Sequence, residues 1–226
     1  MTSPAQKKHV LISDLVRVHA CPVRFYYEQH NSYTESDRYA VCKQLSYHLG
    51  KSLDADGIWE EILAVHPDMD PTLRDLLGIC ISACNKTAWK SAVQTDVRVA
   101  SDKFGMAGMI DRVFDDGSFS IVRASGAMPF GTYAADRLRI AAIAFCLDEM
   151  TGEETPGGHV EYIPDGASRF HEIQPRDRRQ VIASLKKIRE IQDGEIPKHP
   201  LNAPCNRCMY KEKCESSVGQ RLSELL

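Results

Sequence analysis

The sequence predicts an α/β protein with a cysteine-rich tail, and three observations support this prediction. Apolar residues in the first 90 or so positions recur mostly at helical spacing. Short apolar runs and period-two alternation follow, at 95–101, 104–114 and 118–125, as expected for strands. The last 30 or so residues lack apolar periodicity and are rich in proline and cysteine. Such a tail cannot build its own core, so we expect it to depend on what its cysteines bind.

The helical part divides into three segments. One apolar face of the first segment is formed by Leu11, Leu15, Val18 and Phe25. The second segment covers 39–66 and is expected to break near Gly50. The third opens where Asp70 can cap a helix and Pro71 suits its first turn.

The strand-rich part continues through the turn "DDG" at 115–117, which joins the last two of the strands named above. The remaining predicted elements are a helix over 134–150, strands over 158–164 and 168–174, and a basic helix over 176–190. We therefore divide the chain into a helical part at 1–92, a core at 93–195 and a cysteine module at 196–226, together forming one compact unit.

Composition indicates a soluble globular protein, since 26% of the 226 residues are charged and 43% are hydrophobic. Apolar runs such as 140–147 are far shorter than the roughly 20 residues that span a bilayer, so no membrane helix is expected. The N-terminus lacks the apolar region of a secretory signal, and we predict a cytoplasmic location. In that reducing compartment, clustered cysteines more often bind metal than form disulfides.

The net charge of −3 gives no indication of nucleic-acid binding, but the basic helix gathers cations locally. These are Arg176, Arg178, Arg179, Lys186, Lys187 and Arg189. The helix is either a solvated surface or a surface that faces phosphates.

Three cysteines near the C-terminus predict a bound metal centre. Cys205 and Cys208 form a C-x2-C pair and Cys214 follows, a pattern found in zinc ribbons, iron–sulfur sites and redox dithiols. A fourth ligand must lie upstream. Four of the upstream cysteines lie within apolar helices and are interpreted as core: Cys42, Cys80, Cys84 and Cys146. Cys21 precedes a proline at a helix break, so it is either the fourth ligand or another buried thiol.

The segment "ACPVRFYY", His48 on a following helix, "GMIDRV" with Asp111, and the terminal C-x2-C-x5-C together resemble a known family. This is the family of CRISPR-associated, iron–sulfur RecB-like exonucleases, called Cas-four, and the resemblance covers essentially the whole chain. It implies a PD-(D/E)XK, restriction-endonuclease-like core with a mixed central sheet flanked by helices. It also implies a [4Fe-4S] cluster, with zinc as the alternative, held by Cys21, Cys205, Cys208 and Cys214.

The resemblance further implies a role in CRISPR adaptation, a form of antiviral defence. DNA would be the ligand and the CRISPR integrase complex the partner, with prespacer DNA selected or processed before insertion. The sequence gives no indication of the oligomeric state.

The catalytic pattern of this family is incomplete in the chain. The family places an Asp at the end of one strand and Glu-x-Lys on the next, to hold Mn²⁺ or Mg²⁺ and to activate water. Asp111 fits the first position, but Arg123 and Ser125 stand where Glu and Lys are expected. Arginine cannot replace either group, because it is a permanent cation. Arg139 and Ile143 likewise replace a downstream Gln-x3-Tyr pair.

We therefore predict that nuclease activity is lost and that DNA binding persists. His48 and Asp111 would be remnants of a metal site, with Asp115, Asp116 or Asp136 as candidate helpers. The expected DNA-binding residues are Arg123, Arg139, Arg176, Arg179, Lys186 and Lys187. For Arg123 and Arg139 the alternative is structural salt bridges with Asp111 and Asp136.

Two other functions remain open. One is an active, metal-dependent single-strand DNA exonuclease that uses Asp111 and ligands that have migrated in the sequence. The other is an interaction or redox-sensing protein held together by zinc or a cluster.

Overall fold

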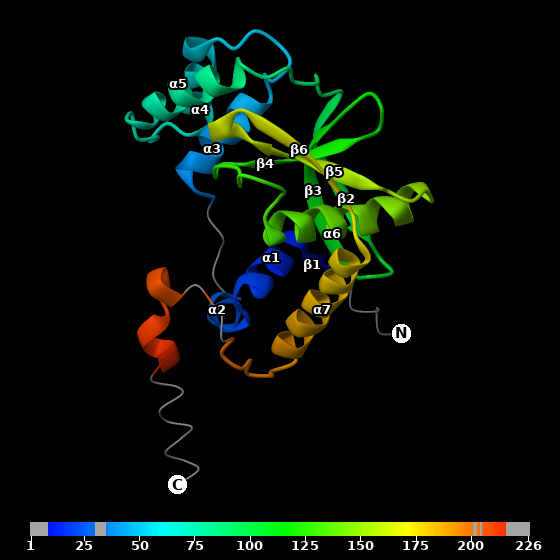
Figure 1. The fold of residues 1–226 in the computed structure, drawn as a ribbon. Helices are drawn as coiled ribbons and strands as arrows, with labels where there is room; N and C mark the ends of the chain where they lie inside the picture. Colours follow the sequence, from blue (N-terminus) through cyan, green and yellow to red (C-terminus); the bar gives the residue numbers. More distant parts are fainter. Residues whose placement is uncertain (1–8, 30–34, 201–202, 204, 216–226) are drawn as a thin grey trace, which may run out of the picture.

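A computed structural model gives the fold and describes residues 9–29, 35–200, 203 and 205–215. The described residues form a mixed six-stranded sheet with helices on both faces (Figure 1). The elements are β1 (Val10–Leu11), α1 (Ile12–Ala20), α2 (Pro22–Glu28), α3 (Asp37–Ser46), α4 (Ala55–Val65), α5 (Leu73–Cys84), β2 (Gln94–Ser101), β3 (Met106–Val113), β4 (Phe119–Arg123), α6 (Ala134–Thr151), β5 (Gly157–Tyr162), η1 (Ile163–Asp165), β6 (Ala167–Glu172), α7 (Pro175–Gln192) and η2 (Cys205–Arg207). Residues 201–202, 204 and 216–226 of the predicted cysteine module lie outside the described residues.

Strand β3 is the centre of the sheet. β2 pairs with it antiparallel, while β1 and β4 pair with its two ends, β1 in parallel and β4 antiparallel. β5 then joins β4 in parallel and β6 joins β5 antiparallel. β1 pairs with β3 at Met106 and Ala107, and β4 pairs with it at Arg112 and Val113, so the two strands diverge along β3 and leave a fork between them. Asp111 lies at this fork.

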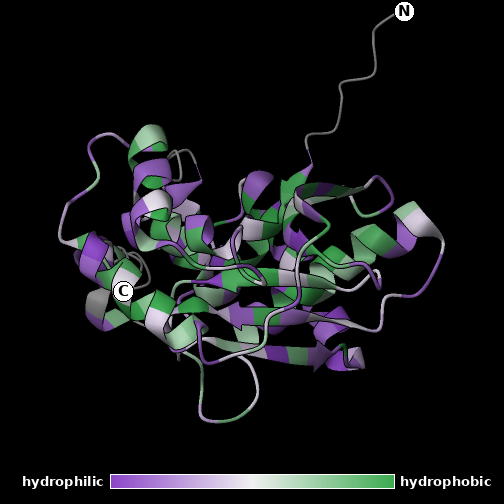
Figure 2. Cartoon of the chain, turned by 90° about the horizontal axis from the view of Figure 1, so that it is seen from above, coloured by the Kyte–Doolittle hydropathy of each residue, from purple (hydrophilic) through white to green (hydrophobic). Residues whose placement is uncertain are grey.

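Helices α3, α4 and α5 form a lobe on one face of the sheet, and α1, α6 and α7 cover the other (Figure 1). Neighbouring residues of β4 show this division, because side chains alternate along a strand. Ile121 packs with the α1, α6 and α7 side, and Val122 packs with the helical lobe. Figure 2 shows hydrophobic and hydrophilic residues alternating along the helices and strands.

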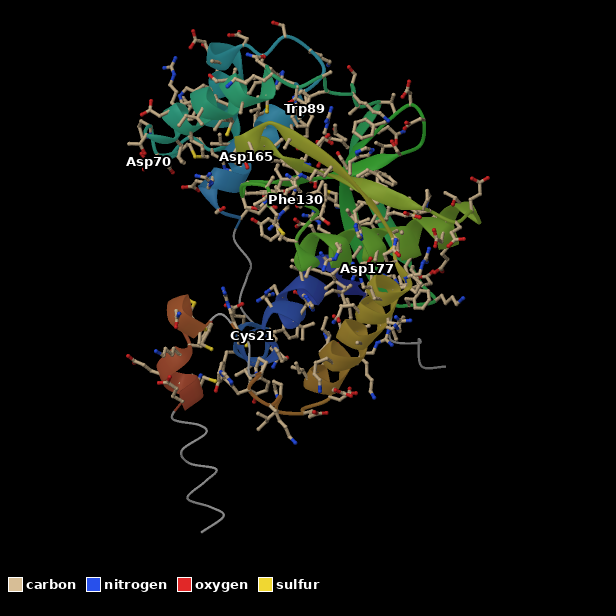
Figure 3. The ribbon with its side chains drawn as sticks, in the orientation of Figure 1. Cys21, Asp70, Trp89, Phe130, Asp165 and Asp177 are labelled. Atoms are coloured by element: carbon tan, nitrogen blue, oxygen red, sulfur yellow. The ribbon has the colours of Figure 1, made fainter. Side chains whose placement is uncertain are left out.

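The lobe has its own core, which includes three cysteines interpreted above as core residues: Cys42, Cys80 and Cys84. Their burial confirms that interpretation. Trp89, labelled in Figure 3, closes the lobe by donating its indole N–H to the carbonyl of Cys84 at 2.9 Å.

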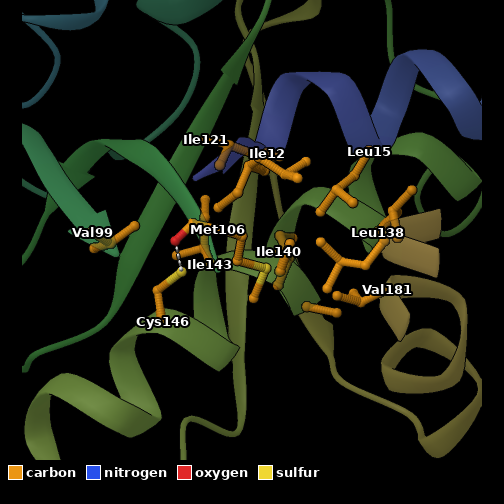
Figure 4. Close-up of a cluster of buried hydrophobic side chains, with 14 of the residues drawn as sticks. Ile12, Leu15, Val99, Met106, Ile121, Leu138, Ile140, Ile143, Cys146 and Val181 are labelled. Carbon is orange, nitrogen blue, oxygen red and sulfur yellow. Dashed lines mark hydrogen bonds between the residues drawn. The ribbon is translucent and has the colours of Figure 1, made fainter. Parts of the chain in front are cut away.

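The larger core lies between the sheet and helix α6 (Figure 4). Helix α6 is buried around much of its circumference, which is typical of a helix enclosed by other elements. Its buried apolar residues are Leu138, Ile140, Ala141, Ala142, Ile143, Ala144 and Cys146. Because alanine side chains are small, the sheet, α1 and α7 can approach α6 closely. Each fully buried aliphatic side chain contributes roughly 1.5–3 kcal/mol to the free energy of unfolding.

A buried ion pair within the sheet includes the arginine that also binds segments of the lobe. Arg112 Nη1 lies 2.6 Å from Glu161 Oε1, and the two side chains are 1% and 2% exposed. The other Arg112 amino group donates to the carbonyls of Leu49, at 3.1 Å, and Lys90, at 2.6 Å. A buried charge is tolerated only when it is paired in this way. Arg112 therefore fixes the segments on both sides of the lobe against β3.

The predicted elements agree with the observed ones, with two corrections. Leu11 belongs to β1 and is exposed, because its segment pairs with β3 and does not continue the apolar face of α1. Asp70 does not cap α5 and Pro71 does not lie in its first turn, because α5 begins at Leu73 with Thr72 as its N-cap. Asp70 Oδ1 instead accepts hydrogen bonds from the Thr72 N–H at 2.9 Å and from the Thr72 hydroxyl at 2.8 Å. These two bonds stabilise a turn that precedes the helix.

None of the helices within the described ranges combines the length and the apolar character that crossing a bilayer requires. The predicted division at 92 and 195 remains a prediction, although β2 begins at Gln94 and α7 ends at Gln192.

Candidate functional site

Asp111 is surrounded by donors on all sides. Its side chain is 3% exposed. Oδ1 accepts from Lys43 Nζ at 2.7 Å and from the Tyr39 hydroxyl at 3.2 Å. Oδ2 accepts from the Val122 backbone N–H at 2.7 Å and from Arg139 Nη2 at 3.5 Å. Both oxygens that could coordinate a metal ion are therefore engaged by the protein itself.

Lys43 reaches this site from helix α3, which presents Tyr39, Lys43 and Tyr47 at intervals of four residues along one face. Its ammonium also lies 2.6 Å from Asp96 Oδ1, and the Tyr47 hydroxyl donates to Asp96 Oδ2 at 2.6 Å. Asp96 stands across from Asp111 on β2, where its φ of 54° is a left-handed conformation uncommon for residues other than glycine. One ammonium thus bridges two carboxylates.

Electrostatics favour an ionised Asp111. Burial raises the pKa of the carboxyl, but Arg139, Lys43 and the Val122 N–H together outweigh burial and hold the pKa below its usual range. The pKa of Tyr39 is raised, by burial and by the Asp111 charge, so this hydroxyl stays a donor. The Asp111 carboxylate is therefore neutralised by two side chains of the protein, Lys43 and Arg139.

Arg123 and Asp136 form a second pair beside it. Arg123 Nε lies 2.9 Å from Asp136 Oδ1, and the Tyr162 hydroxyl donates to Asp136 Oδ2 at 2.9 Å. Burial raises the pKa of Asp136 more than Arg123 and the Tyr162 hydroxyl lower it. Both arginines singled out in the sequence therefore occupy the salt bridges given above as their alternative.

The other expected catalytic residues have separate partners. His48 Nε2 lies 2.7 Å from Glu61 Oε2, on α4. Asp116 pairs with Lys90 at 2.5 Å and accepts from the Ser118 N–H in the "DDG" turn. Asp115 is exposed in the same turn, and Ser125 follows the end of β4. Within the described ranges, no three His, Cys, Asp or Glu side chains are placed to hold a metal ion.

A cavity of about 800 Å³ opens beside the Asp111 network. Its lining includes four arginines, Arg17, Arg98, Arg123 and Arg139, and two carboxylates, Glu35 and Asp136. The walls are apolar and include three exposed side chains: Leu11, Met109 and Met150. Apolar walls with a few cations suit a ligand that has both flat apolar and anionic parts.

The four cysteines of the expected metal centre line one small cavity of about 40 Å³, together with Arg24 and His199. Cys21 comes from the N-terminus of α2, where its Sγ accepts from the Arg24 N–H at 3.4 Å. Figure 3 shows Cys21 beside the C-terminal turn that carries the other three. Residues almost two hundred positions apart in the sequence thus meet at one point.

Contacts around this cavity hold the tail on α2. Tyr210 stacks on Tyr27 with ring centroids 5.4 Å apart, and Lys213 Nζ lies 4.5 Å from the Tyr27 ring centre. Cys205 Sγ lies 3.4 Å from His199 Nε2. Burial and the charges of Cys21, Cys205 and Cys208 raise the pKa of Cys214.

Cys21, Cys205, Cys208 and Cys214 are, by residue type, the donor set of either a zinc site or a four-iron cluster.

The basic helix is partly neutralised by its own acids. Lys187 lies 2.5 Å from Glu190 and 3.3 Å from Glu195, and Lys186 lies 3.7 Å from Glu190. Arg176 is 69% exposed, 4.0 Å from Asp177. Arg179 is exposed, with no carboxylate partner among the described residues. The lysines of this helix therefore fit a solvated surface, whereas Arg179 is left available to a phosphate.

Sequence analysis missed Lys43, Tyr39 and Asp96. Tyr39, Lys43 and Tyr47 are spaced by four residues, beside the buried Val41, Cys42 and Leu45 of the same helix, and Asp96 lies on the strand before Asp111. Those signals alone do not show that the helix face and the two strands meet.

No protein-family model and no curated protein matches the chain. Among solved structures, it is similar to a "putative exonuclease" from Eubacterium rectale, with a TM-score of 0.58 and 10% identity over 92% of this chain and 89% of the other. SSO0001 aligns with a TM-score of 0.43 and 16% identity over 95% and 89%. The first similarity establishes an exonuclease-like α/β fold, in which a mixed sheet carries helices on both faces.

Proposed function

We propose that the protein binds DNA on a nuclease-derived fold whose catalytic centre no longer cleaves. The observation that carries this proposal is the network at Asp111, where Lys43 and Arg139 supply the positive charge that a divalent metal supplies in a working site. Arg123 pairs with Asp136 where the family places a catalytic carboxylate.

The cavity beside this network is the proposed DNA site. Arg98 has no carboxylate partner among the described residues, and Arg123 and Arg139 can donate to a phosphate with amino groups that their salt bridges leave available. The apolar walls suit the faces of unpaired bases. Phosphate contacts of this kind give affinity without sequence preference.

The four cysteines are proposed to hold a [4Fe-4S] cluster, with zinc as the alternative. When bound, the cluster would fix the C-terminal turn to α2 through metal–thiolate bonds. Tyr27 and Tyr210 already orient the two segments toward each other. The role we propose for the cluster is structural.

The resemblance to the Cas-four family extends the proposal to CRISPR adaptation. In that setting the protein would select prespacer DNA beside the integrase complex, and another subunit would cut it. This biological role rests on the sequence motifs quoted above.

The experiment is a paired binding and cleavage assay on labelled single- and double-stranded DNA with Mn²⁺. The protein would be purified anaerobically and its iron and zinc measured, with Asp111→Ala as the matched variant. We expect DNA binding without cleavage by either protein. Cleavage by the parent that the variant lacks would overturn the inactive assignment.

One observation favours the active alternative. Asp96, Asp111 and Lys43 place two carboxylates and a lysine together, which are the residue types that the family uses for catalysis. If Lys43 moved away from the carboxylates, a metal could enter between them. The same assay decides this, because activity would then require both Asp96 and Asp111.

A further inference from the structure

The loop between β4 and α6 holds an exposed aromatic side chain in place. Phe130, labelled in Figure 3, is 88% exposed. The loop around it is pinned by hydrogen bonds from three directions. The Ala127 N–H donates to Asp165 Oδ2 at 2.7 Å, and the Tyr133 hydroxyl donates to the Gly126 carbonyl at 3.1 Å.

Arginines bind the carbonyls on both sides of Phe130. Arg169 Nη1 donates to the Gly131 carbonyl at 2.7 Å and its Nη2 to the Pro129 carbonyl at 3.5 Å. Arg137 donates to the Thr132 carbonyl at 2.6 Å. Gly131 has a φ of +67°, a left-handed conformation that lets the chain turn at this point. The backbone that carries the ring is therefore fixed, although the ring itself has no cover.

Two arginines and the Asp165 carboxylate border this loop. In the part of the chain that the structure describes, both arginines donate to carbonyls: Arg169 to those of Gly131 and Pro129, and Arg38, on α3, to that of Ala124 at 2.9 Å. Neither has a carboxylate partner among the described residues, in contrast to Arg123 and Arg139. An exposed ring beside cations that are not neutralised fits a ligand with a flat face and a negative charge.

The loop is also continuous with the proposed DNA site. It leaves β4 at Arg123 and enters α6 just before Asp136, and both of these residues line the 800 Å³ cavity. A strand that lies in the cavity can therefore leave it over this loop.

We propose that Phe130 stacks on an unpaired base of a DNA strand, with Arg169 and Arg38 facing the adjacent phosphates. This inference rests on the proposed DNA binding and adds a positioning residue that selects unpaired over paired nucleotides. A base in a duplex is already stacked, so it gains little from the ring. The fixed loop lets the ring stack with little loss of conformational freedom.

The test compares Phe130→Ala, Phe130→Trp and the control Phe170→Ala, which truncates an exposed phenylalanine on β6. Binding would be measured by fluorescence anisotropy on a 12-nucleotide single strand and on the matching duplex. A second strand carrying 2-aminopurine would report stacking through its emission. Each variant would be checked for parental thermal stability.

We expect Phe130→Ala to weaken single-strand binding about tenfold and duplex binding by less than twofold. Phe130→Trp should bind at least as tightly as the parent and change the 2-aminopurine emission, whereas Phe170→Ala should match the parent. If the parent binds DNA and Phe130→Ala binds each form as tightly as the parent does, the stacking role is overturned and the ring is left for a protein partner. If the parent binds no DNA, the proposed function is overturned, and the stacking role of Phe130 is overturned with it.

Discussion

The Asp111 network and the cysteine cavity are both clusters of groups able to bind metal, but they differ in how they are satisfied. At Asp111 every ligand atom already has a partner from the chain, and the cations are Lys43 and Arg139. In the cysteine cavity, four thiols face one space, and the contacts around them come mostly from neighbouring side chains. The first site is complete without an added ion, whereas the second is where we propose that a metal centre binds.

This difference follows from where each site lies. A buried carboxylate must be paired within the fold, because leaving its charge uncompensated costs several kcal/mol. Thiols can remain neutral until a metal removes their protons, so they impose no such requirement. A metal site inside the core is therefore expected to become a salt-bridge network when its ligands are replaced. A cysteine site that joins distant parts of the chain is expected either to bind its metal centre or to remain as neutral thiols.

The largest expected effect is on the cysteine cavity. If the cavity holds the proposed cluster, Cys208→Ala should lower bound iron and the visible absorbance several-fold, because loss of one of the four thiolates weakens retention of the cluster. Iron analysis and absorbance of anaerobic protein would measure this. Cys146→Ala is the control, since that thiol is buried in the core far from the tail in sequence, and it should keep its iron. Full iron content in Cys208→Ala would contradict the proposal that the cysteine cavity, unlike the Asp111 network, binds a metal centre.

Removing the internal cation tests the other side of the comparison. Lys43→Met should lower the free energy of unfolding by about 3 kcal/mol, because Asp111 and Asp96 lose the ammonium between them. Urea unfolding measures this, with exposed Lys51→Met as the control expected to change stability by less than about 0.5 kcal/mol. Mn²⁺ should restore part of the loss in Lys43→Met alone. A loss below about 1 kcal/mol would mean that Lys43 is not needed to complete the site.

Acid should open the same network. The pKa of Asp111 lies lower in the folded than in the unfolded protein, so its stabilising contribution is complete above about pH 4 and is lost as pH falls through the folded-state pKa. The difference in unfolding free energy between the parent and Asp111→Asn should therefore stay constant from pH 7 to 5 and shrink below pH 4. A difference that shrinks between pH 7 and 5 would contradict the assigned ion pairs.

The smallest effect extends the comparison to helix α7. Lys187 is neutralised by Glu190 and Glu195, whereas Arg179 has no carboxylate partner among the described residues. If this surface contacts DNA, Arg179→Ala should reduce the slope of log affinity against log salt by about 0.9, and Lys187→Ala by less. Equal slopes in both variants and the parent would show that α7 is only a solvated surface.

The order of elements was predictable because period-two strands and helical spacing are local patterns, and the chain obeys them from β2 to α7. The meeting of Cys21 with the C-terminal cysteines was expected from the family resemblance and not from spacing. The partners of Asp111 were not predictable, because Lys43 lies 68 residues away and approaches through the packing of α3 on the sheet. Likewise, the pairing of His48 with Glu61 depends on how α4 docks.

Arg112 has a consequence for how the molecule opens. Its guanidinium pairs with Glu161 on β5 and donates to the carbonyls of Leu49, between α3 and α4, and Lys90, after α5. Lifting the lobe would leave the Arg112–Glu161 pair in the sheet but would remove both carbonyl partners of the second amino group, so opening the lobe costs two hydrogen bonds to a charged group. Amide protons of the segments around Leu49 and Lys90 should therefore exchange with solvent deuterium more slowly than those of exposed loops.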